Sequence, residues 1–529
     1  MSEHSKDDEE HKVSTFVEPS TLKVDSKKDD VAGSFLAGIA ARPDAAELLA
    51  PWTKADEKRI LRWKIDPIIL TLMTMMGAVD KVCIGTAAVL GMREDLGLVA
   101  QQYSWTSSVI YCGALLGVYP TLMIMQRLPA GRYMAVNCAI WGIILMASAA
   151  CKNYAGLMVA RFFLGLFESV IFAGSGLIVA MYWKRSEQPW RTAVKFSTLS
   201  SIMARFALPL PLARPNRSSR LQNGILSYAS ASYEGSLAQW RLLFILVGAV
   251  TFAWSIVTFI FLPDSPTTAW WLTMRERVIA TERTKENRTG TENKTLKKSQ
   301  IVEAFTDPKT YFFFAINLVL NVPNSGLTTF NSIVVASLGF STKETMLLAI
   351  PTGVISWISS IVFAFLAVKT GKRHLCAMIA CLLPLIGTVV LHVVPRSNHS
   401  GSLAGLYILY CYWGPYVTVS TLSYANTAGY TKKLAVLGFA YMGYSTGCLI
   451  GPSNPTKRPV FLYHADLLLV RTALAIALIG ALWVHTIYLN RRKAEQRVKY
   501  EQEHGNAEGL VDAWHDQTDW ENPKFEYII

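Results

Sequence analysis

Apolar runs of roughly 20 residues, the length that crosses a hydrocarbon core of about 30 Å as a helix, alternate with short polar stretches along most of this chain. The runs predict twelve membrane spans, near residues 65–89, 104–126, 131–150, 154–182, 192–230 (interrupted), 240–262, 311–336, 344–368, 374–395, 401–424, 434–452 and 467–489. We therefore expect an all-α integral membrane protein with twelve transmembrane helices.

Polar segments divide the twelve spans into two sets of six. We expect a disordered cytosolic N-terminal tail at 1–60, a six-helix half at 61–262, a cytosolic linker at 263–310, a second six-helix half at 311–490 and a cytosolic C-terminal tail at 491–529. The two sets have similar internal spacing, since the separation between Gly97 and Gly131 is nearly equal to that between Gly339 and Gly371. Two pseudo-symmetric halves are typical of secondary transporters, whose substrate site lies near the midplane between them.

Lysine and arginine determine the predicted orientation. The formal net charge is +13, but the basic residues flank the apolar runs instead of forming the single stripe that would suggest nucleic-acid binding. Because short cytosolic loops are enriched in Lys and Arg, we expect both termini in the cytosol. Lys457 and Arg458, between the last two spans, depart from this rule. The expected location is the cell membrane, with an endomembrane or the vacuole as the alternative.

Composition gives no sign of an enzyme. The eight cysteines are scattered and form no CxxC pair, so neither a metal site nor a disulfide framework is predicted. The chain contains no phosphate loop, no clustered metal ligands and no nucleophile elbow. We therefore expect no cofactor and no ATP-driven step. The expected partners are the lipid bilayer and a transported solute, and the pattern does not require an oligomer.

Two charged residues, Arg161 and Glu168, interrupt the apolar run at 154–182. A charge at bilayer depth costs about 2.5–3.5 kcal/mol on insertion scales and usually faces the bundle interior. Seven residues are about two helical turns, so both side chains lie on nearly one face. We expect Arg161 to bind a substrate carboxylate bidentately and Glu168 to carry a proton. The alternative is a fixed ion pair of Arg161 with Glu168 or Asp80.

Asp80 and Lys81 are adjacent in the first span. Successive helical residues point about 100° apart, so only one of the two can face a central pathway squarely. We expect that one to take part in proton coupling or anion attraction. The alternative is a gate pair on the extracellular side.

Polar and aromatic residues of the second half extend the candidate site. Asn317 and Asn321 are one helical turn apart and could bind a polar ligand or hydrogen-bond between helices. Tyr412 and Tyr441 could line a pocket for a flat ring or pack against neighbouring spans. These four residues complete the predicted substrate-binding set with Arg161.

Several segments resemble the major facilitator superfamily, and within it the fungal anion:cation symporters of allantoate permease type. The resemblance is carried by Ala160-Arg-Phe-Phe-Leu-Gly-Leu-Phe-Glu168, Leu262-Pro-Asp-Ser-Pro266 and Thr518-Asp-Trp-Glu-Asn522, among others. It implies movement of a small organic anion (allantoate, nicotinate, pantothenate or a similar carboxylate) together with protons, by alternating access. Alternatives are export of a secondary metabolite, a sensor that does not transport, and the inactive product of a faulty gene model.

The resemblance also suggests a gate. Two turns, Gly131-Arg132 and Gly371-Lys372-Arg373, are similar to a degenerate form of the superfamily's cytosolic gating motif, although the first lacks the motif's Asp. The alternative is simple charge anchoring at the membrane surface.

Other positions depart from the family pattern. Arg205–Gln222 is a basic, proline-bearing insert that cannot continue a lipid-facing helix and suggests a retained intron, or else a real loop. Lys195 stands where relatives carry an aromatic residue, and Ser453–Asp466 is also atypical.

Four Asn-X-Ser/Thr sequons occur, at Asn216, Asn287, Asn293 and Asn398. We expect glycosylation at Asn398, because it falls in a predicted extracellular loop. Asn287 and Asn293 fall in the predicted cytosolic linker and should remain unmodified.

Overall fold

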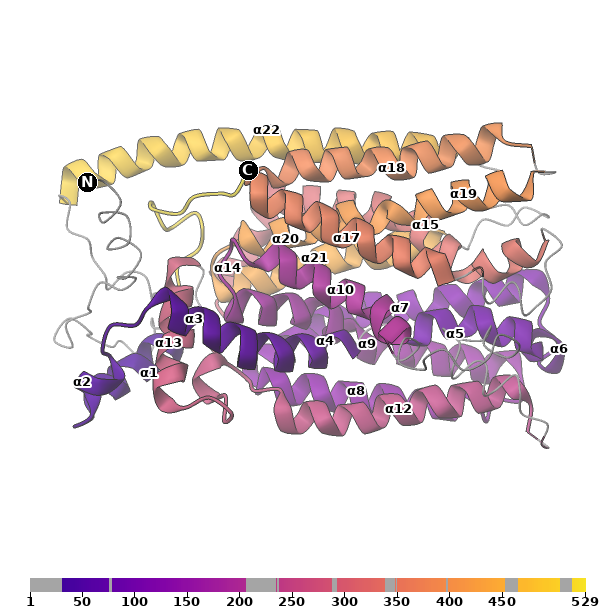
Figure 1. Cartoon of the computed structure of the whole chain (residues 1–529), viewed down its shortest axis with the longest axis horizontal. Coiled ribbons are helices and arrows are strands. Elements are labelled where there is room, and N and C mark those ends of the chain that lie inside the picture. Colours follow the sequence, from indigo (N-terminus) through magenta and orange to yellow (C-terminus); the bar gives the residue numbers. More distant parts are fainter. Residues whose placement is uncertain are drawn as a thin grey trace, which may run out of the picture.

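The protein is described by a computed structural model that covers residues 31–75, 79–205, 235, 237–287, 293–337, 348, 350–395, 398–451, 465–504 and 516–529. These residues form helices and no strands, and the long helices run side by side in one bundle (Figure 1). We call the end of the bundle with α3 (Lys54–Ile60), α13 (Met274–Glu282) and residues 516–529 the tail end. The opposite end, with α6 (Arg93–Asp95), is the loop end.

Where it is described, the first half follows the predicted spans, with one broken helix, and residues 206–230 of the predicted fifth span lie outside the described part. Its elements are η2 (Leu61–Leu70), α4 (Thr71–Met75), α5 (Val79–Ala87), η3 (Ala88–Met92), α7 (Ala100–Arg127), α8 (Ala130–Ser148), α9 (Tyr154–Tyr182), α10 (Gln188–Arg205) and α12 (Gln239–Phe261). Pro67 lies within the π-helical segment η2. Proline has no N–H to donate and disturbs an α-helix. A second break lies at Leu90 and Gly91, where Gly91 has a positive φ of 90°.

The second half contains α15 (Pro308–Ser337), α17 (Ile350–Thr370), α18 (Arg373–Val393), α19 (His399–Leu409), η6 (Tyr410–Tyr412), α20 (Trp413–Ala425), α21 (Tyr430–Ile450) and α22 (Ala465–His504). The predicted span at 401–424 is divided by the short 3₁₀ segment η6. Pro415 follows it in the first turn of α20, where a missing N–H disturbs no helical hydrogen bond. The long α22 extends beyond the tail end of the bundle (Figure 1).

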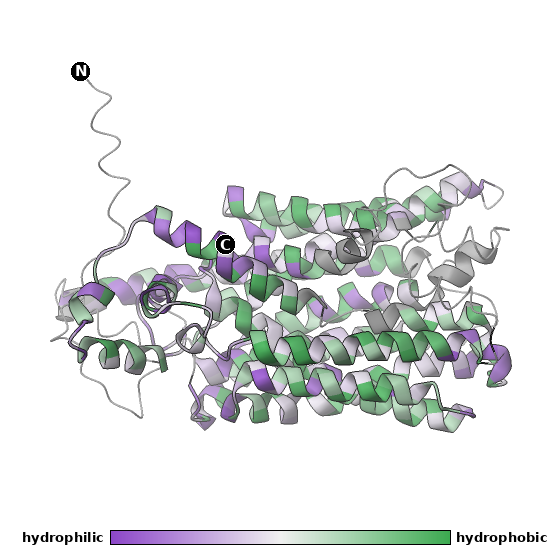
Figure 2. Ribbon diagram, turned by 60° about the horizontal axis from the view of Figure 1, so that its bottom comes forward, coloured by the Kyte–Doolittle hydropathy of each residue, from purple (hydrophilic) through white to green (hydrophobic). Residues whose placement is uncertain are grey.

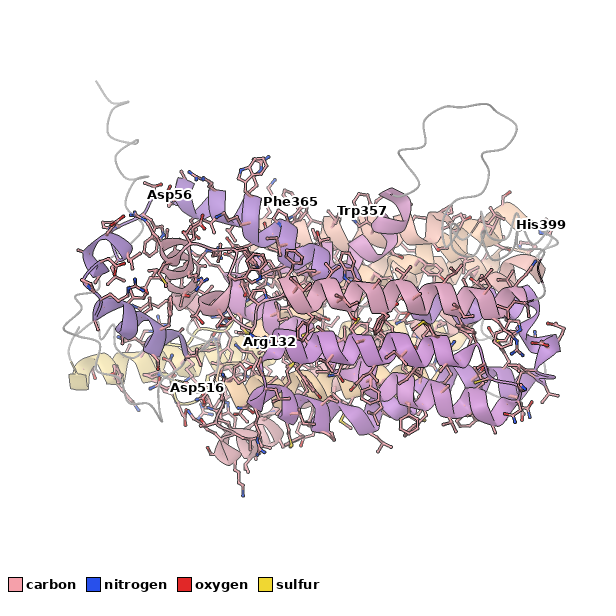
Figure 3. The ribbon with its side chains drawn as sticks, turned by 90° about the horizontal axis from the view of Figure 1, so that it is seen from below. Asp56, Arg132, Trp357, Phe365, His399 and Asp516 are labelled. Atoms are coloured by element: carbon pink, nitrogen blue, oxygen red, sulfur yellow. The ribbon has the colours of Figure 1, made fainter. Side chains whose placement is uncertain are left out.

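Hydrophobic residues predominate along the middle of the long helices, and hydrophilic residues gather toward the two ends of the bundle (Figure 2). Within the described residues, eight helices are long and apolar enough to cross a membrane by length and composition. Side chains such as Trp357 and Phe365 of α17 are exposed on the outer face of the bundle (Figure 3). The all-α membrane architecture expected from the sequence is confirmed.

Glycines allow the closest helix contacts inside each half. A Cβ added to Gly165 of α9 would lie 1.7 Å from the Ile110 carbonyl oxygen of α7. In the second half, Cβ atoms at Gly443 and Gly447 of α21 would each lie 2.3 Å from a carbonyl oxygen of α15. Small residues spaced four apart let membrane helices pack backbone against backbone. Each half therefore has one pair of closely packed helices, α7 with α9 and α15 with α21, whose contact has no room for a larger side chain at these glycines.

Part of the predicted N-terminal tail and of the predicted linker is helical. Residues 31–60 contain α1 (Val31–Ala40), α2 (Ala45–Leu48) and α3, and residues 263–310 contain η4 (Pro266–Thr268), α13, η5 (Arg283–Asn287) and α14 (Lys298–Thr306). Leu36 and Ile39 of α1 are buried together with Val278 of α13. Apolar faces of short helices explain this order, because their burial is favourable away from the membrane too. Residues 1–30 lie outside the described part.

Candidate functional site

Helix α9 carries the two charges that the sequence singles out. It begins after Asn153, whose side chain accepts a hydrogen bond of 2.9 Å from Gly156 N and so caps the helix. Arg161 and Glu168 are each only 2% exposed. A rise of 1.5 Å per residue separates their Cα atoms by roughly 10 Å along the helix axis. The two residues therefore occupy different depths of the bundle.

Arg161 lies nearer the loop end. Its guanidinium carbon is 5.4 Å from the ring centroid of Phe244 in α12, which is a cation–π distance. Its charge also acts on Tyr103 of α7. Both neighbours belong to the first half of the chain.

Glu168 lies about two turns deeper, where α9 approaches the second half. One helical turn further along α9, Phe172 stacks on Tyr444 of α21 with ring centroids 5.6 Å apart. Glu168 thus lies where the two halves meet, which is the position expected of a group whose surroundings change when the halves move.

A layer of stacked aromatic rings joins the two halves inside the bundle. Its members come from both halves and are Phe172 of α9, Phe196 of α10, Trp413 and Tyr416 of α20, and Tyr441 and Tyr444 of α21. We call these six residues the central aromatic layer. Ring centroids and planes within it fall in the range of favourable offset-stacked or edge-to-face pairs.

Contacts across the two halves define this layer. Phe172 stacks on Tyr441 at 5.5 Å with planes 15° apart, and on Tyr444 at 5.6 Å. Phe196 meets Tyr416 edge-on at 5.5 Å and lies 5.8 Å from Trp413. Phe172, Phe196 and Trp413 are only half-buried, although long helices surround them. These rings therefore keep surface that a small molecule can contact.

Lys195 of α10 borders the layer. Its Nζ donates a hydrogen bond of 2.7 Å to Ser175 Oγ of α9 and lies 4.3 Å from the ring centroid of Phe196. The lysine is only 7% exposed. The sequence analysis noted Lys195 because relatives carry an aromatic residue at this position. The sequence alone did not place Lys195 in the candidate site.

The predicted polar and aromatic residues of the second half are buried. Asn317 and Asn321 of α15 are buried, and each donates a hydrogen bond of 2.8 Å to the carbonyl four residues earlier. Tyr412 of η6 donates to Asn324 Oδ1 at 2.5 Å and lies 5.4 Å from the Trp413 ring. Tyr441 belongs to the central aromatic layer itself. Asp80 and Lys81 lie on α5, and their side chains are outside the described part of the structure.

A carboxylate from a distant part of the chain contacts the first predicted gating turn, Gly131-Arg132, which lacks the Asp of the motif. Asp264, which follows α12, accepts hydrogen bonds from Gly131 N at 3.0 Å and Arg132 N at 3.2 Å. The Arg132 guanidinium lies 3.7 Å from the same carboxylate. A Cβ at Gly131 would lie 2.6 Å from the Leu262 carbonyl oxygen, so the turn requires glycine. The sequence analysis quoted Asp264 only as part of a family segment.

The second gating turn joins the two halves. Gly371 has a positive φ of 69°, which glycine adopts without strain. Lys372 is exposed, whereas Arg373 is buried and donates a hydrogen bond to the carbonyl oxygen of Arg185 in the first half. Arg185 in turn donates to Asn426 Oδ1 at 3.3 Å. Figure 3 places Arg132 toward the tail end, far from His399 at the loop end.

Residues 516–529 pack into the tail end and carry a buried ion cluster. Lys309 Nζ lies 2.6 Å from one Asp519 oxygen, and Lys432 Nζ lies 2.8 Å from the other. Lys432 also pairs with Glu303 at 2.8 Å and with Asp307 at 3.0 Å. We call these five residues the tail-end ion cluster. Burial alone would raise the pKa of Asp519, but the two ammonium groups overcome it and hold this pKa well below its usual range.

The same segment reaches the first half. The Arg185 guanidinium lies 4.7 Å from the ring centroid of Phe525, and burial lowers the pKa of Arg185 to about 10. Arg373 N donates a hydrogen bond of 2.7 Å to the Ile529 carbonyl oxygen. Residues 516–529 thus contact both halves at the tail end.

The sequons differ in their surroundings. Asn287 and Asn293 are buried, and their side-chain amides donate to Trp183 O and Asp516 Oδ2, both at 2.9 Å. Asn398 is exposed at the loop end, where its Oδ1 caps α19 by accepting from Gly401 N at 3.0 Å. Asn216 lies outside the described residues, as do residues 206–222 of the insert and residues 452–464 of the second atypical stretch.

Comparisons with known proteins identify the architecture. The sequence model of the Major Facilitator Superfamily matches residues 70–452. The chain belongs to this superfamily. The allantoate permease of Saccharomyces cerevisiae is 32% identical, covering 93% of this chain and 91% of that protein. The MFS-type transporter cnsL of Penicillium expansum is also 32% identical, covering 96% of this chain and 94% of that protein.

A solved superfamily structure supports the fold. The proton:xylose symporter XylE aligns with a TM-score of 0.58 over 79% of this chain and 95% of that chain, at 12% identity. The expected fold of two pseudo-symmetric six-helix halves and the resemblance to allantoate permease are confirmed. The protein is a multi-pass membrane transporter of the superfamily, in agreement with the expectation that it is not an enzyme.

Proposed function

We propose that this transporter moves a small organic anion together with protons, by alternating access. The observation that carries the proposal is the junction of the halves. There, the carboxylate of Glu168 and the ammonium group of Lys195 are buried beside aromatic rings from both halves. Buried charges in a membrane bundle mark substrate and proton pathways. The name of the allantoate permease, a relative of this chain, supports an organic carboxylate.

In the proposed cycle, Arg161 attracts the substrate anion as it enters from the loop end. Its guanidinium is buried against Phe244 and offers the planar fork that suits a carboxylate. Asn317, Asn321, Tyr412 and Tyr441 contribute polar and ring contacts from the second half. Asp80 and Lys81 remain proposed coupling residues.

Glu168 is the proposed proton carrier. A carboxyl group at the moving junction meets different neighbours in the two orientations of the halves, so its pKa changes between them. The same group can then bind a proton on one side of the membrane and release it on the other. The gating turns Gly131-Arg132 and Gly371-Lys372-Arg373 would open and close the tail end in this cycle.

Uptake of labelled allantoate, nicotinate and pantothenate in permease-deficient yeast at pH 5 and pH 7 tests the proposal. Arg161→Ala should abolish uptake, and Glu168→Gln should remove its pH dependence. Full uptake by the Arg161 variant would reject the anion role of that residue. A pH dependence that survives in Glu168→Gln would move the coupling role to another group.

We further propose that the tail end faces the cytosol and that the protein resides in the cell membrane. Basic residues concentrate at the tail end, as the positive-inside rule requires of a cytosolic face. Asn398 would then be glycosylated at the outer loop end. A glycosidase-sensitive mass shift that Asn398→Gln abolishes is the expected result, whereas a shift that persists in this variant would contradict the assignment.

A further inference from the structure

We infer that Lys195 anchors the anionic group of the substrate, and that the central aromatic layer restricts the substrate class to carboxylates attached to a flat ring. This inference rests on the proposed function and sharpens it. It assigns the anion to a residue on α10, closer to the junction of the halves than Arg161. Its basis is the chemistry of Lys195 and the geometry of the rings around it.

Within the part of the chain that the structure describes, the partners of Lys195 leave its charge uncompensated. The Nζ atom donates to the neutral hydroxyl of Ser175 at 2.7 Å. Within the described ranges, no carboxylate forms an ion pair with it. Two other buried lysines differ from Lys195 in this respect, since Lys309 and Lys432 each contact at least two carboxylates. A buried ammonium without a counter-charge is costly, and an anionic substrate would supply that charge.

The geometry around Lys195 explains the preference for a flat ring. Its Nζ lies 4.3 Å from the Phe196 centroid, and Phe196 in turn contacts the half-buried Trp413. Phe172, also half-buried, lies 6.3 Å from Phe196 with planes 28° apart. A planar ring placed against the exposed parts of these faces would stack on them while its carboxylate met the ammonium. A saturated ring of similar size presents hydrogens instead of a π face and loses the stacking contribution.

Ser175 fixes where the charge lies. Its hydroxyl donates to the Phe172 carbonyl oxygen at 2.8 Å while accepting from Lys195, so it ties the ammonium to the turn of α9 that carries Phe172. The anchor and one stacking face are thus held together by a single turn of helix.

Three probes separate charge from ring shape. Benzoate carries both, benzamide keeps the flat ring without charge, and cyclohexanecarboxylate keeps the charge without the flat ring. Direct binding to the purified full-length protein should be tighter for benzoate than for either other probe, by about threefold to tenfold over cyclohexanecarboxylate. Equal binding of benzoate and cyclohexanecarboxylate would overturn the ring preference.

Two variants test the anchor. Lys195→Gln should weaken benzoate binding by at least about 30-fold, because the carboxylate would then be buried without a cation, while benzamide binding should change little. Lys195→Arg should recover a large part of the loss. Lys369→Gln removes an exposed lysine at the end of α17 and serves as the matched control. Unchanged benzoate affinity in Lys195→Gln would overturn the anchor.

Thermal unfolding of each variant guards against loss of the fold. If Lys195→Gln unfolds at the same temperature as the parent protein but loses affinity only for the charged probes, a purely structural role of Lys195 is rejected. Failure of the inference is distinguishable from failure of the proposed function. Transport of allantoate or pantothenate without binding of any ring carboxylate would overturn the inference alone. Absence of binding and transport for every anion, ring-bearing or not, would overturn both.

Discussion

The tail-end ion cluster and the central aromatic layer both join segments that are distant in the sequence, but with opposite chemistry. At the tail end, Lys309 and Lys432 contact carboxylates from α14, from Asp307 between α14 and α15, and from residues 516–529. At the centre, rings from both halves stack on one another beside Lys195, whose described hydrogen-bond partner is a neutral hydroxyl. The tail-end ion cluster pairs its charges within the protein. At the central aromatic layer, the ammonium group of Lys195 has no carboxylate partner among the described residues, so a bound anion could supply one.

This difference separates the two tasks of a transporter. A cluster that is complete within the protein stabilises one arrangement of the tail end and needs no ligand. A layer with an uncompensated cation and half-buried rings is improved by a ligand, so it couples binding to the arrangement of the halves. Substitutions should therefore act mainly on stability at the tail end and mainly on binding at the centre.

The largest expected effect is on stability and comes from Asp519→Asn. Loss of this carboxylate leaves Lys309 and Lys432 without their shared counter-ion in a buried site, and breaking such a network typically costs about 3–5 kcal/mol. Thermal or denaturant unfolding in detergent measures the change. Asp44→Asn, which breaks an exposed pair with Arg42, is the matched control and should leave unfolding unchanged. Equal losses of stability in Asp519→Asn and Asp44→Asn would show that the tail-end ion cluster contributes no more than an exposed ion pair.

The pH dependence of this contribution follows from the depressed pKa of Asp519. Because the folded-state pKa lies below the unfolded value of about 3.9, the stabilisation is fully present above that value and is lost as the pH falls through the folded-state pKa. The difference in unfolding free energy between the parent and Asp519→Asn should thus be constant from about pH 5 to 8. It should shrink below about pH 4. A difference that changed between pH 5 and 8 would assign the effect to another group.

A smaller effect on stability is expected in the central aromatic layer. Phe172→Leu keeps an apolar side chain but removes three stacked contacts. The two closer ones, with Tyr441 and Tyr444, are each worth about 0.5–1.5 kcal/mol beyond burial. Unfolding free energy should fall by roughly 1–3 kcal/mol, and benzoate affinity should fall as well. Loss of stability with full retention of ligand affinity would show that the layer serves packing alone.

The smallest effect is expected for Arg132→Gln. The side chain is 64% exposed and lies 3.7 Å from Asp264, and an exposed pair of this kind contributes less than about 1 kcal/mol. Unfolding should be nearly unchanged, while uptake rates report any gating role. A loss of stability as large as that of Asp519→Asn would place Arg132 in the same class as the tail-end ion cluster.

Hydropathy was sufficient to predict the membrane architecture, because the thickness of the bilayer sets the length of each span. It also led to Arg161 and Glu168, since charges inside apolar runs are conspicuous. Breaks in the helices were harder to place. Pro67 and Pro415 are visible in the sequence, but the segments η2 and η6 depend on how neighbouring helices pack.

Partners distant in sequence were missed for a different reason. Tyr441 was predicted as a site residue, but nothing local indicates that it stacks on Phe172, which lies in the other half. Asp264 completes the turn at Arg132 from more than a hundred residues away, and Asp519 joins Lys309 across an even longer separation. Such pairings are determined by tertiary packing, and a single sequence contains no record of them.

Residues 516–529 have a further consequence for how the protein is made. These residues are synthesised after the described spans. The ion pairs of Lys309 and Lys432 with Asp519 can therefore form only after those spans have been translated. At synthesis rates of about 5–20 residues per second, the 210 residues from Lys309 to Asp519 represent a delay of roughly 10–40 seconds. Nascent chains released before this segment would carry two basic groups without their last partner, a defect that cellular quality control can recognise.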